Sequence, residues 1–488
     1  MSKKILNGFG LCLVVSLVLV LASANITQAA STTKQLSTNY TLVNLGAQDA
    51  HVVVQYLLDS GATWTAPAGS TNFTITANGG QKIVRQYQDA MTPTSGRGSA
   101  VVSSDQPLGA VVQILAVGQT ASSGAYSGFT AVSDKFYVPL VARRLSSASG
   151  TVNSQVMIQN TGGSATTVSV QFIGAASYTK SGISIPAGAT YYYDLDDETN
   201  LVAPWYGSAV VQAASGGTVA VVSNLFTGSN GMQTYNAFPA SSVGPKWLVP
   251  LFTARLANGL SAPIAVQNLS GAPIAVNGIT LSCTPDAGAT GFSALTVKNS
   301  TAVADNASYY FNPVTDSTNF PTGWYGSCTV DAGSSNVVAF VQMRTVGTDN
   351  AGAYEAINAS GTNTKAFVPL VAKRLGNGFA SAVTIQNLSS TTDANVTLTY
   401  TPSPDYVAAG GSATALTTST TIPKSASLIQ NQRLTTFAVG ATAMPIGWYG
   451  TLTVQSTNSV AIDGFVQLTN VNNPAGDTFM AHGVFTQP

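Results

Sequence analysis

The sequence predicts an all-β chain of four similar β-sandwich units, and three observations lead to this prediction. The tetrapeptide Gly-Trp-Tyr-Gly occurs at residues 323–326 and again at 447–450, and Pro-Trp-Tyr-Gly occurs at 204–207. The residues around the three places also match, which indicates an internal repeat. Within each repeat apolar residues alternate with polar ones, and a period of two is typical of a half-buried β-strand.

Two further motifs set the register of the repeats. A segment containing Val-Pro-Leu begins at Phe136, Trp247 and Ala366, and about fifteen residues after each one a strand ends in asparagine. The first repeat lacks the Val-Pro-Leu segment but has the asparagine. By subtraction the asparagines lie 116, 108 and 119 residues apart, and they are Asn44, Asn160, Asn268 and Asn387. We therefore divide the chain after its leader into four units, which are 31–134, 135–244, 245–364 and 365–488.

Two strands of each unit have one apolar face. In the strand after the asparagine, Val52, Val54 and Tyr56 alternate with more polar residues, and the other units repeat this pattern. In the Trp-Tyr-Gly strand, each tryptophan shares its face with the following glycine, so the tyrosine between them points the other way. The equivalents of the first three residues are Val168, Val170 and Phe172; Ile279, Leu281 and Cys283; and Val396, Leu398 and Tyr400.

Short strands separated by Gly, Asn, Asp and Pro, in units of this length, favour a sandwich of immunoglobulin-like type. Short polar segments such as 130–135 and 360–365 join the units. We therefore expect the four sandwiches to form an elongated, jointed rod.

The first thirty residues have the order of a secretory signal, which is predicted to form a helix ahead of the sandwiches. Basic residues come first, an apolar run follows at 8–22, and small residues end the segment at Ala29 and Ala30. Cleavage is expected near Ala30 or Ser31, with an uncleaved anchor helix as the alternative. No later apolar run is long enough to span a bilayer, so the protein is expected outside the cell or on its surface.

The composition argues against charged partners. Only 8% of the residues are Asp, Glu, Lys or Arg, and the formal net charge is zero. Binding to nucleic acid or to an anionic membrane depends on an excess of positive charge. We therefore expect neither partner.

Cys283 and Cys328 are the two cysteines that follow the signal segment. Both lie at inward positions of the third unit, one in each of the two strands described above. In the other units a large apolar residue faces a small or medium one at this pair of positions. A disulfide between facing sheets explains the exchange, and an exported protein permits it. Two buried free thiols are the alternative, and a zinc site is less favoured because no histidine lies nearby.

The Trp-Tyr-Gly motif has a structural and a functional interpretation. Alternation places each tryptophan in the core at the start of its strand, followed by a glycine that permits close packing. The tyrosines that follow the tryptophans then face outward, where they could stack on sugar rings. These candidate glycan contacts are Tyr206, Tyr325 and Tyr449.

Motifs for catalysis or cofactor binding do not occur in the sequence. It has two histidines, His51 and His482, and none of the nucleophile-elbow, zinc-protease, phosphate-loop or dinucleotide patterns. The densest acidic cluster could offer oxygen ligands to calcium or paired carboxylates for glycoside hydrolysis, although a solvated loop is the default. It contains Asp194, Asp196, Asp197 and Glu198. We expect a protein that is not an enzyme and needs no cofactor.

Taken together, the Val-Pro-Leu segment, the Ile-Gln-Asn strand end and the Trp-Tyr-Gly-Ser strand resemble the tandem immunoglobulin-like modules of secreted bacterial surface proteins. The resemblance covers nearly all of the chain after residue 30. It implies a structural role in an envelope layer, sheath or fibre, with self-association or other surface proteins as partners. The alternative is an extracellular array of carbohydrate-binding or adhesion modules.

Overall fold

A computed structural model describes residues 15–21, 36–116, 123–129, 131–228, 230–286, 288–472 and 477–487, and these residues form an all-β protein. The two α-helices are one turn long, and the remaining helical segments are 3₁₀ turns of three residues. All strand pairs are antiparallel, and none of the sheets closes on itself. The helical elements are α1 (Ala68–Thr71), α2 (Pro404–Ala408), η1 (Gln86–Gln88), η2 (Leu195–Asp197) and η3 (Ala240–Ser242).

Each sequence unit contributes one sheet, here called the outer sheet, that contains the strand after the asparagine. Its partner on one side is the Trp-Tyr-Gly strand or its equivalent. In spatial order the outer sheet of the first unit is β1 (Val15–Leu21), β6 (Gly98–Ser104), β3 (Ala50–Leu58) and β4 (Asn72–Ile75), and that of the second is β13 (Tyr178–Ile185), β12 (Thr166–Gly174), β15 (Trp205–Ala213), β9 (Lys135–Arg143) and β18 (Phe238–Pro239). The outer sheet of the third unit is β23 (Leu295–Lys298), β22 (Thr280–Pro285), β25 (Trp324–Asp331), β19 (Lys246–Ala254) and β28 (Ile357–Asn358). The outer sheet of the fourth unit is β32 (Leu416–Ile422), β31 (Ala394–Pro402), β36 (Tyr449–Ser456), β29 (Lys365–Ala372) and β39 (Phe485–Gln487).

The second sheet of each unit, the inner sheet, contains the strand that ends in the asparagine. The inner sheets are β5 (Gln81–Val84), β2 (Leu36–Asn44), β7 (Leu108–Ala116) and β8 (Ser123–Ser127); β10 (Leu145–Ser147), β11 (Gly150–Asn160), β16 (Val219–Thr227) and β17 (Gly231–Asn236), with β14 (Thr190–Asp194) beside β11; β20 (Leu260–Ser261), β26 (Val337–Thr345), β21 (Ile264–Asn268) and β24 (Ser308–Phe311), with β27 (Ala351–Glu355) beside β26; and β33 (Ser427–Asn431), β30 (Phe379–Asn387), β37 (Ile462–Asn470) and β38 (Phe479–Gly483). A two-stranded ribbon, β34 (Ala438–Val439) and β35 (Thr442–Ala443), is separate from both sheets of the fourth unit.

The predicted faces of the strands are confirmed. The residues assigned inward in the strand after each asparagine are all buried, from Val52 in the first unit to Tyr400 in the fourth. The asparagines are themselves fully buried, and their side chains tie the end of the strand to the loop that follows. Asn160, for example, donates to the carbonyls of Ser164 and Ile185 and accepts from the backbone N–H of Gly162. The repeated asparagine is therefore a structural clamp.

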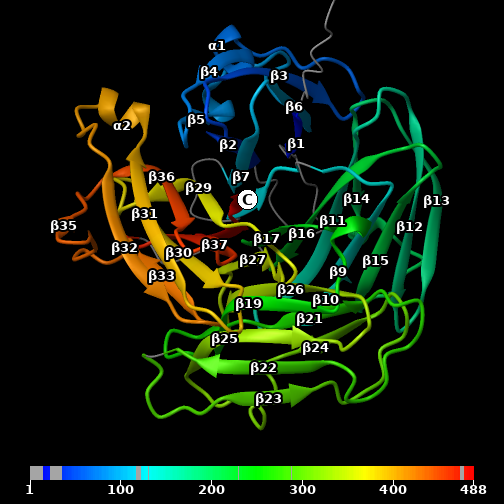
Figure 1. The fold of residues 1–488 in the computed structure, drawn as a ribbon. Coiled ribbons are helices and arrows are strands. Elements are labelled where there is room, and N and C mark those ends of the chain that lie inside the picture. Colours follow the sequence, from blue (N-terminus) through cyan, green and yellow to red (C-terminus); the bar gives the residue numbers. More distant parts are fainter. Residues whose placement is uncertain are drawn as a thin grey trace, which may run out of the picture.

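The elongated rod is wrong, because the four units close into a ring. The last strands of the inner sheets, β8, β17, β27 and β38, contact one another in cyclic order, so the fourth unit lies against the first (Figure 1). These strands cannot face water: β17, for instance, is buried at five of its six positions. Their approach is so close that a Cβ atom on Gly352 would lie 2.2 Å from the ring of Phe479. Burial of both faces of the inner strands drives the closure.

Neighbouring units meet at four contacts, here called seams and numbered 1–2, 2–3, 3–4 and 4–1. At three of them the carbonyl of the proline in the Val-Pro-Leu segment accepts a hydrogen bond from the next unit. Ser308 Oγ donates to Pro139 O over 2.7 Å, and Ser427 Oγ donates to Pro250 O over 3.1 Å. At the closing 4–1 seam the donor is Gln81 Nε2, which bonds Pro369 O. The Val-Pro-Leu segment thus serves the assembly of the ring as well as its own sheet.

The helix predicted for the signal segment is wrong where the structure describes it. Residues 15–21 form β1, which pairs with β6 at the edge of the first outer sheet. Leu19 lies opposite Ala100 of β6, just as Val138 lies opposite the equivalent residue, Ala209. The first unit has no Val-Pro-Leu strand of its own, and β1 fills that place with residues of high strand propensity. Residues 1–14 and 22–30 of the signal segment lie outside the described residues.

Candidate functional site

The three Trp-Tyr-Gly motifs divide their aromatic residues between the core and the surface, as alternation predicts. The tryptophans are buried, and the indole N–H of Trp205 donates to Ala176 O over 2.8 Å. Tyr206 is 49% exposed, whereas Tyr325 and Tyr449 are half-buried. The tyrosines lie in three separate sheets, and each has its own neighbours. They are three separate candidate contacts.

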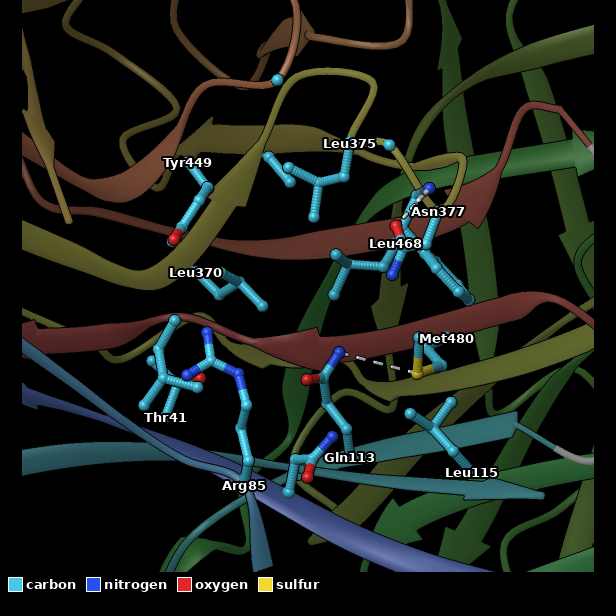
Figure 2. Close-up of a pocket in the computed structure, with 16 residues that line it drawn as sticks. Thr41, Arg85, Gln113, Leu115, Leu370, Leu375, Asn377, Tyr449, Leu468 and Met480 are labelled. Carbon is cyan, nitrogen blue, oxygen red and sulfur yellow. Dashed lines mark hydrogen bonds between the residues drawn. The ribbon is translucent and has the colours of Figure 1, made fainter. Parts of the chain in front are cut away.

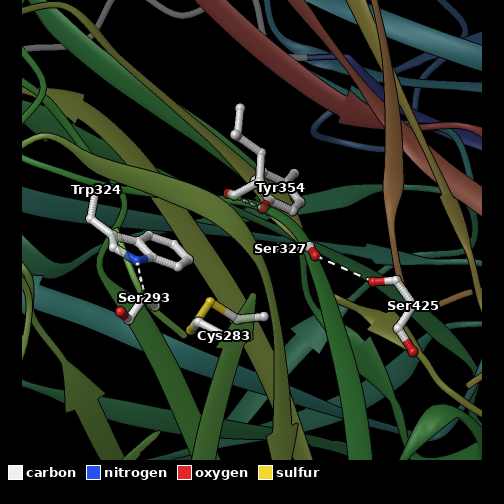
Figure 3. The surroundings of a disulfide bond; sticks show 8 residues. Cys283, Ser293, Trp324, Ser327, Tyr354 and Ser425 are labelled. Carbon is white, nitrogen blue, oxygen red and sulfur yellow. Dashed lines mark hydrogen bonds between the residues drawn. A yellow bond between two sulfur atoms is a disulfide. The ribbon is translucent and has the colours of Figure 1, made fainter. Parts of the chain in front are cut away.

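The predicted disulfide between Cys283 and Cys328 is present (Figure 3). Its predicted position between facing sheets is wrong, because the two cysteines lie directly opposite each other on the paired strands β22 and β25. Their Cα atoms are 4.0 Å apart, close to the spacing of a non-hydrogen-bonded antiparallel pair. Alternation assigned both residues to the inward face but could not tell neighbours in one sheet from partners across the core.

Removal of the disulfide should destabilise the protein measurably. The bond joins residues separated by 45 positions, and in the chain-entropy model such a loop contributes up to about 4 kcal/mol. We expect a double variant, C283A/C328A, to lose 2 to 4 kcal/mol in urea unfolding, a range typical of disulfides. Reduction of the native chain with dithiothreitol should give the same loss. An unchanged midpoint after verified reduction would contradict this prediction.

Three of the four acidic side chains at 194–198 make contacts within the protein, and the fourth, Asp197, is exposed. Asp194 Oδ1 accepts the backbone N–H of Asp196, and Asp196 Oδ1 is paired with Arg144 Nε. Glu198 accepts hydrogen bonds from the hydroxyl of Tyr193 and from Asn200. Across the described parts of the chain, no three His, Cys, Asp or Glu side chains are placed to hold a metal ion. The calcium hypothesis gains no support from these contacts.

The two histidines occupy different environments. His51 is on the surface of the first unit, 2.7 Å from Asp105 Oδ2. His482 is 1% exposed, and burial lowers its pKa to about 4, so it is neutral at pH 7. Although the first and fourth units meet, one imidazole is exposed and the other is enclosed.

The sequence analysis missed Asp477, which lies at the centre of the ring. Its carboxylate accepts backbone N–H groups from all three other units: Ser123 and Met232 donate to Oδ2, and Ala351 donates to Oδ1. The residue is 1% exposed, and this burial raises the pKa of its carboxyl well above the usual value. One side chain therefore connects the starts of β8, β17 and β27 to the fourth unit. The third unit also has an acid at the equivalent position, Asp349, whereas the first two units have Ala121 and Asn230 there. The repeat therefore gave no sign that the aspartate of the fourth unit would bond all three other units.

A second carboxyl, Glu355, lies at the other end of the inner strands. Its Oε1 accepts the backbone N–H of Asn236, whose side chain donates to Ser127 O. Ser127 in turn donates to Gly483 O. These contacts again link all four units, and burial raises the pKa of Glu355 to about 7.

Because of this raised pKa, Glu355 should make stability depend on pH. Between its ordinary pKa of 4.5 and about 7, the folded state holds a proton that the unfolded state has released. The free energy of unfolding therefore falls as pH rises through this window, by up to about 3 kcal/mol. The variant E355Q should lack this fall, as measured by the difference between the two proteins in urea unfolding from pH 4 to 8. Parallel curves would contradict the prediction. Other buried groups also have shifted pKa values, namely Asp477, His482 and Asp463, whose pKa burial raises to about 7, but they are common to both proteins and cancel in the difference.

The 4–1 seam contains a cavity of about 360 Å³ (Figure 2). The first unit supplies a polar wall and the fourth unit a largely apolar one. Two atoms of the polar wall, Asn39 Oδ1 and Thr41 Oγ1, are buried and have no hydrogen-bond partner among the described residues. The polar wall includes Asn39, Thr41, Arg85 and Gln113; the apolar wall includes Leu370, Leu375, Phe379, Tyr449, Leu468 and Met480.

The cavity lies where two of the other seams have an aromatic side chain. Tyr192 at the 1–2 seam and Tyr310 at the 2–3 seam occupy equivalent positions on the inner sheets, as their strand pairing shows. The hydroxyl of Tyr192 donates to Gly98 O over 2.9 Å, across the seam. At the 4–1 seam the equivalent residue is Ile83, which pairs with Thr41 and lines the cavity. The shorter side chain leaves space that a tyrosine fills at the 1–2 and 2–3 seams.

Among the described residues, no helix is long and apolar enough to cross a membrane.

Comparisons with known proteins give no family for this chain. No family model matches it, and no curated protein matches it. One solved structure found is "Crystal structure of tetra-tandem repeat in extending region of large adhesion protein", with 10% sequence identity, covering 96% of this chain and 98% of that one. Its TM-score of 0.10 is too low to carry an argument about fold or function.

Proposed function

We propose that this chain is a secreted, non-enzymatic structural protein of the cell surface, in which four immunoglobulin-like sandwiches form a closed subunit that associates with further copies of itself. The low charge, the disulfide and the order of the first thirty residues favour an exported protein. The rigid central contacts of Asp477 and Glu355 favour a building block that keeps one shape.

The observation that carries this proposal is the edge of β6. Residues 15–21 complete the first outer sheet, yet they belong to the segment whose removal we expect on export. Cleavage near Ser31 would leave β6 paired with β3 but without a partner on its other edge, the place that the Val-Pro-Leu strand occupies in the other units. An open strand edge pairs readily with an extended segment of another chain. We infer that a second copy supplies that segment, so that export and assembly are coupled.

The test compares three proteins by light scattering and negative-stain electron microscopy. The chain starting at Ser31 should form ordered oligomers, whereas the chain that retains residues 15–21 should remain monomeric. In the Ser31 chain, V101K places a charge on the outward face of β6 and should abolish assembly. V53K is the matched control, since Val53 faces outward on the neighbouring strand β3 and is 54% exposed. A monomeric Ser31 chain, or assembly that V101K leaves intact, would refute the proposal.

A carbohydrate-binding array remains the second candidate, and the exposure of Tyr206 favours it. Its ring lies 5.7 Å from that of Tyr310, in an edge-to-face arrangement across the 2–3 seam. A glycan array probed with the Ser31 chain and with Y206A separates the two functions. Binding that depends on Tyr206 would support the array, whereas ordered oligomers without glycan binding support the structural protein.

A further inference from the structure

We propose that the cavity of the 4–1 seam is a binding site for one neutral, hydroxyl-bearing six-membered ring, that is, a single pyranose unit. This inference is independent of the assembly at β6, which lies in the other sheet of the first unit. It rests on the volume of the cavity, on the chemistry of its two walls and on the charge at its rim.

The volume of the cavity fits one ring. About 360 Å³ lies at the lower end of the range of small-molecule pockets. The equivalent space at the 1–2 seam is filled by the ring of Tyr192, which shows that a six-membered ring with a hydroxyl group can be placed between two units in this way. A ligand of this shape would fill the space beside Ile83 that a tyrosine ring fills at the 1–2 seam.

The two walls favour a sugar over a phenol. Leu370, Leu468 and Tyr449 offer apolar surface to the C–H face of a ring (Figure 2). On the opposite wall, Asn39 Oδ1 and Thr41 Oγ1 are buried acceptors without partners, and such atoms cost free energy until a donor reaches them. Gln113 adds an amide whose N–H group donates to a thioether sulfur, Met480 Sδ, at 3.9 Å, and sulfur is a weak acceptor. A phenol has one hydroxyl group and cannot reach all of these groups, whereas a pyranose has several.

The charge at the rim favours a neutral ligand. Arg85 is the charged group among the lining residues, and its Nη1 lies 3.0 Å from Asp405 Oδ2. This ion pair joins the first unit to α2 of the fourth, and the carboxylate balances the charge of the guanidinium. An anionic sugar would have to compete with Asp405, so the proposal is limited to uncharged rings.

The test is a calorimetric titration of the full chain with glucose, galactose, mannose and N-acetylglucosamine, each used singly. At least one of them should bind saturably with a stoichiometry of one. I83Y fills the cavity with the side chain found at the 1–2 and 2–3 seams and should abolish this binding. I429Y is the matched control, because Ile429 is the equivalent residue at the 3–4 seam, where it is partly exposed; it should bind like the parent chain.

A second variant guards against a folding defect in I83Y. T41V keeps the shape of the side chain and removes its hydroxyl, so affinity should fall threefold to tenfold, the effect of one hydrogen bond, while the melting temperature stays within a few degrees. The proposal is overturned if no sugar binds, if phenol binds and the sugars do not, or if I83Y is folded and binds sugar as well as the parent chain does.

Discussion

Replacing Asp477 by alanine should lower the free energy of unfolding by about 3 to 5 kcal/mol, because it removes a buried carboxyl group that accepts several hydrogen bonds. Three backbone N–H groups, from Ser123, Met232 and Ala351, would lose their acceptor. Each unsatisfied buried donor costs about 1 to 3 kcal/mol. Since the donors come from three units, the loss falls on the contacts that hold the ring together.

The variant D477N separates the hydrogen bonds from the shape of the side chain. An amide has nearly the same volume, but only one of its two end atoms accepts hydrogen bonds. Its oxygen can accept hydrogen bonds either from Ser123 and Met232 or from Ala351. The free energy of unfolding of D477N should therefore lie between those of the parent chain and D477A. Urea unfolding gives the free energies, and hydrogen exchange at the N–H groups of Met232 and Ala351 locates the loss. Similar stability of all three proteins would show that the centre of the ring does not depend on this carboxylate.

The sequence analysis predicted the faces of the strands because alternation is a local property. Whether Val54 or Cys283 faces inward depends on a period of two along a few residues, and no knowledge of distant contacts is needed. The same property explains why the disulfide was predicted only in part. Alternation along each strand assigned both cysteines to the core side, but it does not show which strands are neighbours in a sheet, and β22 and β25 are paired.

The ring and its cavity could not be predicted in this way. Closure depends on contacts between units that lie hundreds of residues apart, such as Gln81 with Pro369. One signal was present in the sequence. The segment 219–227 has apolar or uncharged residues on both faces of the strand, and in the structure all nine of these residues are buried. A strand buried on both faces needs a covering layer on each side, which a rod of separate sandwiches does not supply. The cavity lies beside Ile83, where the 1–2 and 2–3 seams have a tyrosine, and this difference becomes visible only when the inner sheets are aligned in space.

Substitutions in the repeated Trp-Tyr-Gly motif should have the second large effect on stability. Its two aromatic residues are adjacent in the sequence but point to opposite faces of the strand, so their replacement should have different effects. Trp205 is 3% exposed, its ring centroid lies 6.0 Å from that of Phe172, and its indole N–H donates to Ala176 O. Replacing it with alanine removes a large buried side chain and leaves a carbonyl without its donor. We expect W205A to lose about 3 to 5 kcal/mol.

The neighbouring variant Y206A is the matched control, since Tyr206 is 49% exposed and makes an edge contact with Tyr310. Its loss should stay below about 1 kcal/mol, as is usual for surface positions. W205F should fall between the two, because phenylalanine keeps most of the packing but cannot donate to Ala176. All three are measured by urea unfolding with a common slope. If Y206A costs as much as W205A, the motif contributes to stability mainly through its contacts at the seam between units. The tryptophan would then not be the anchor of the sheet that its burial indicates.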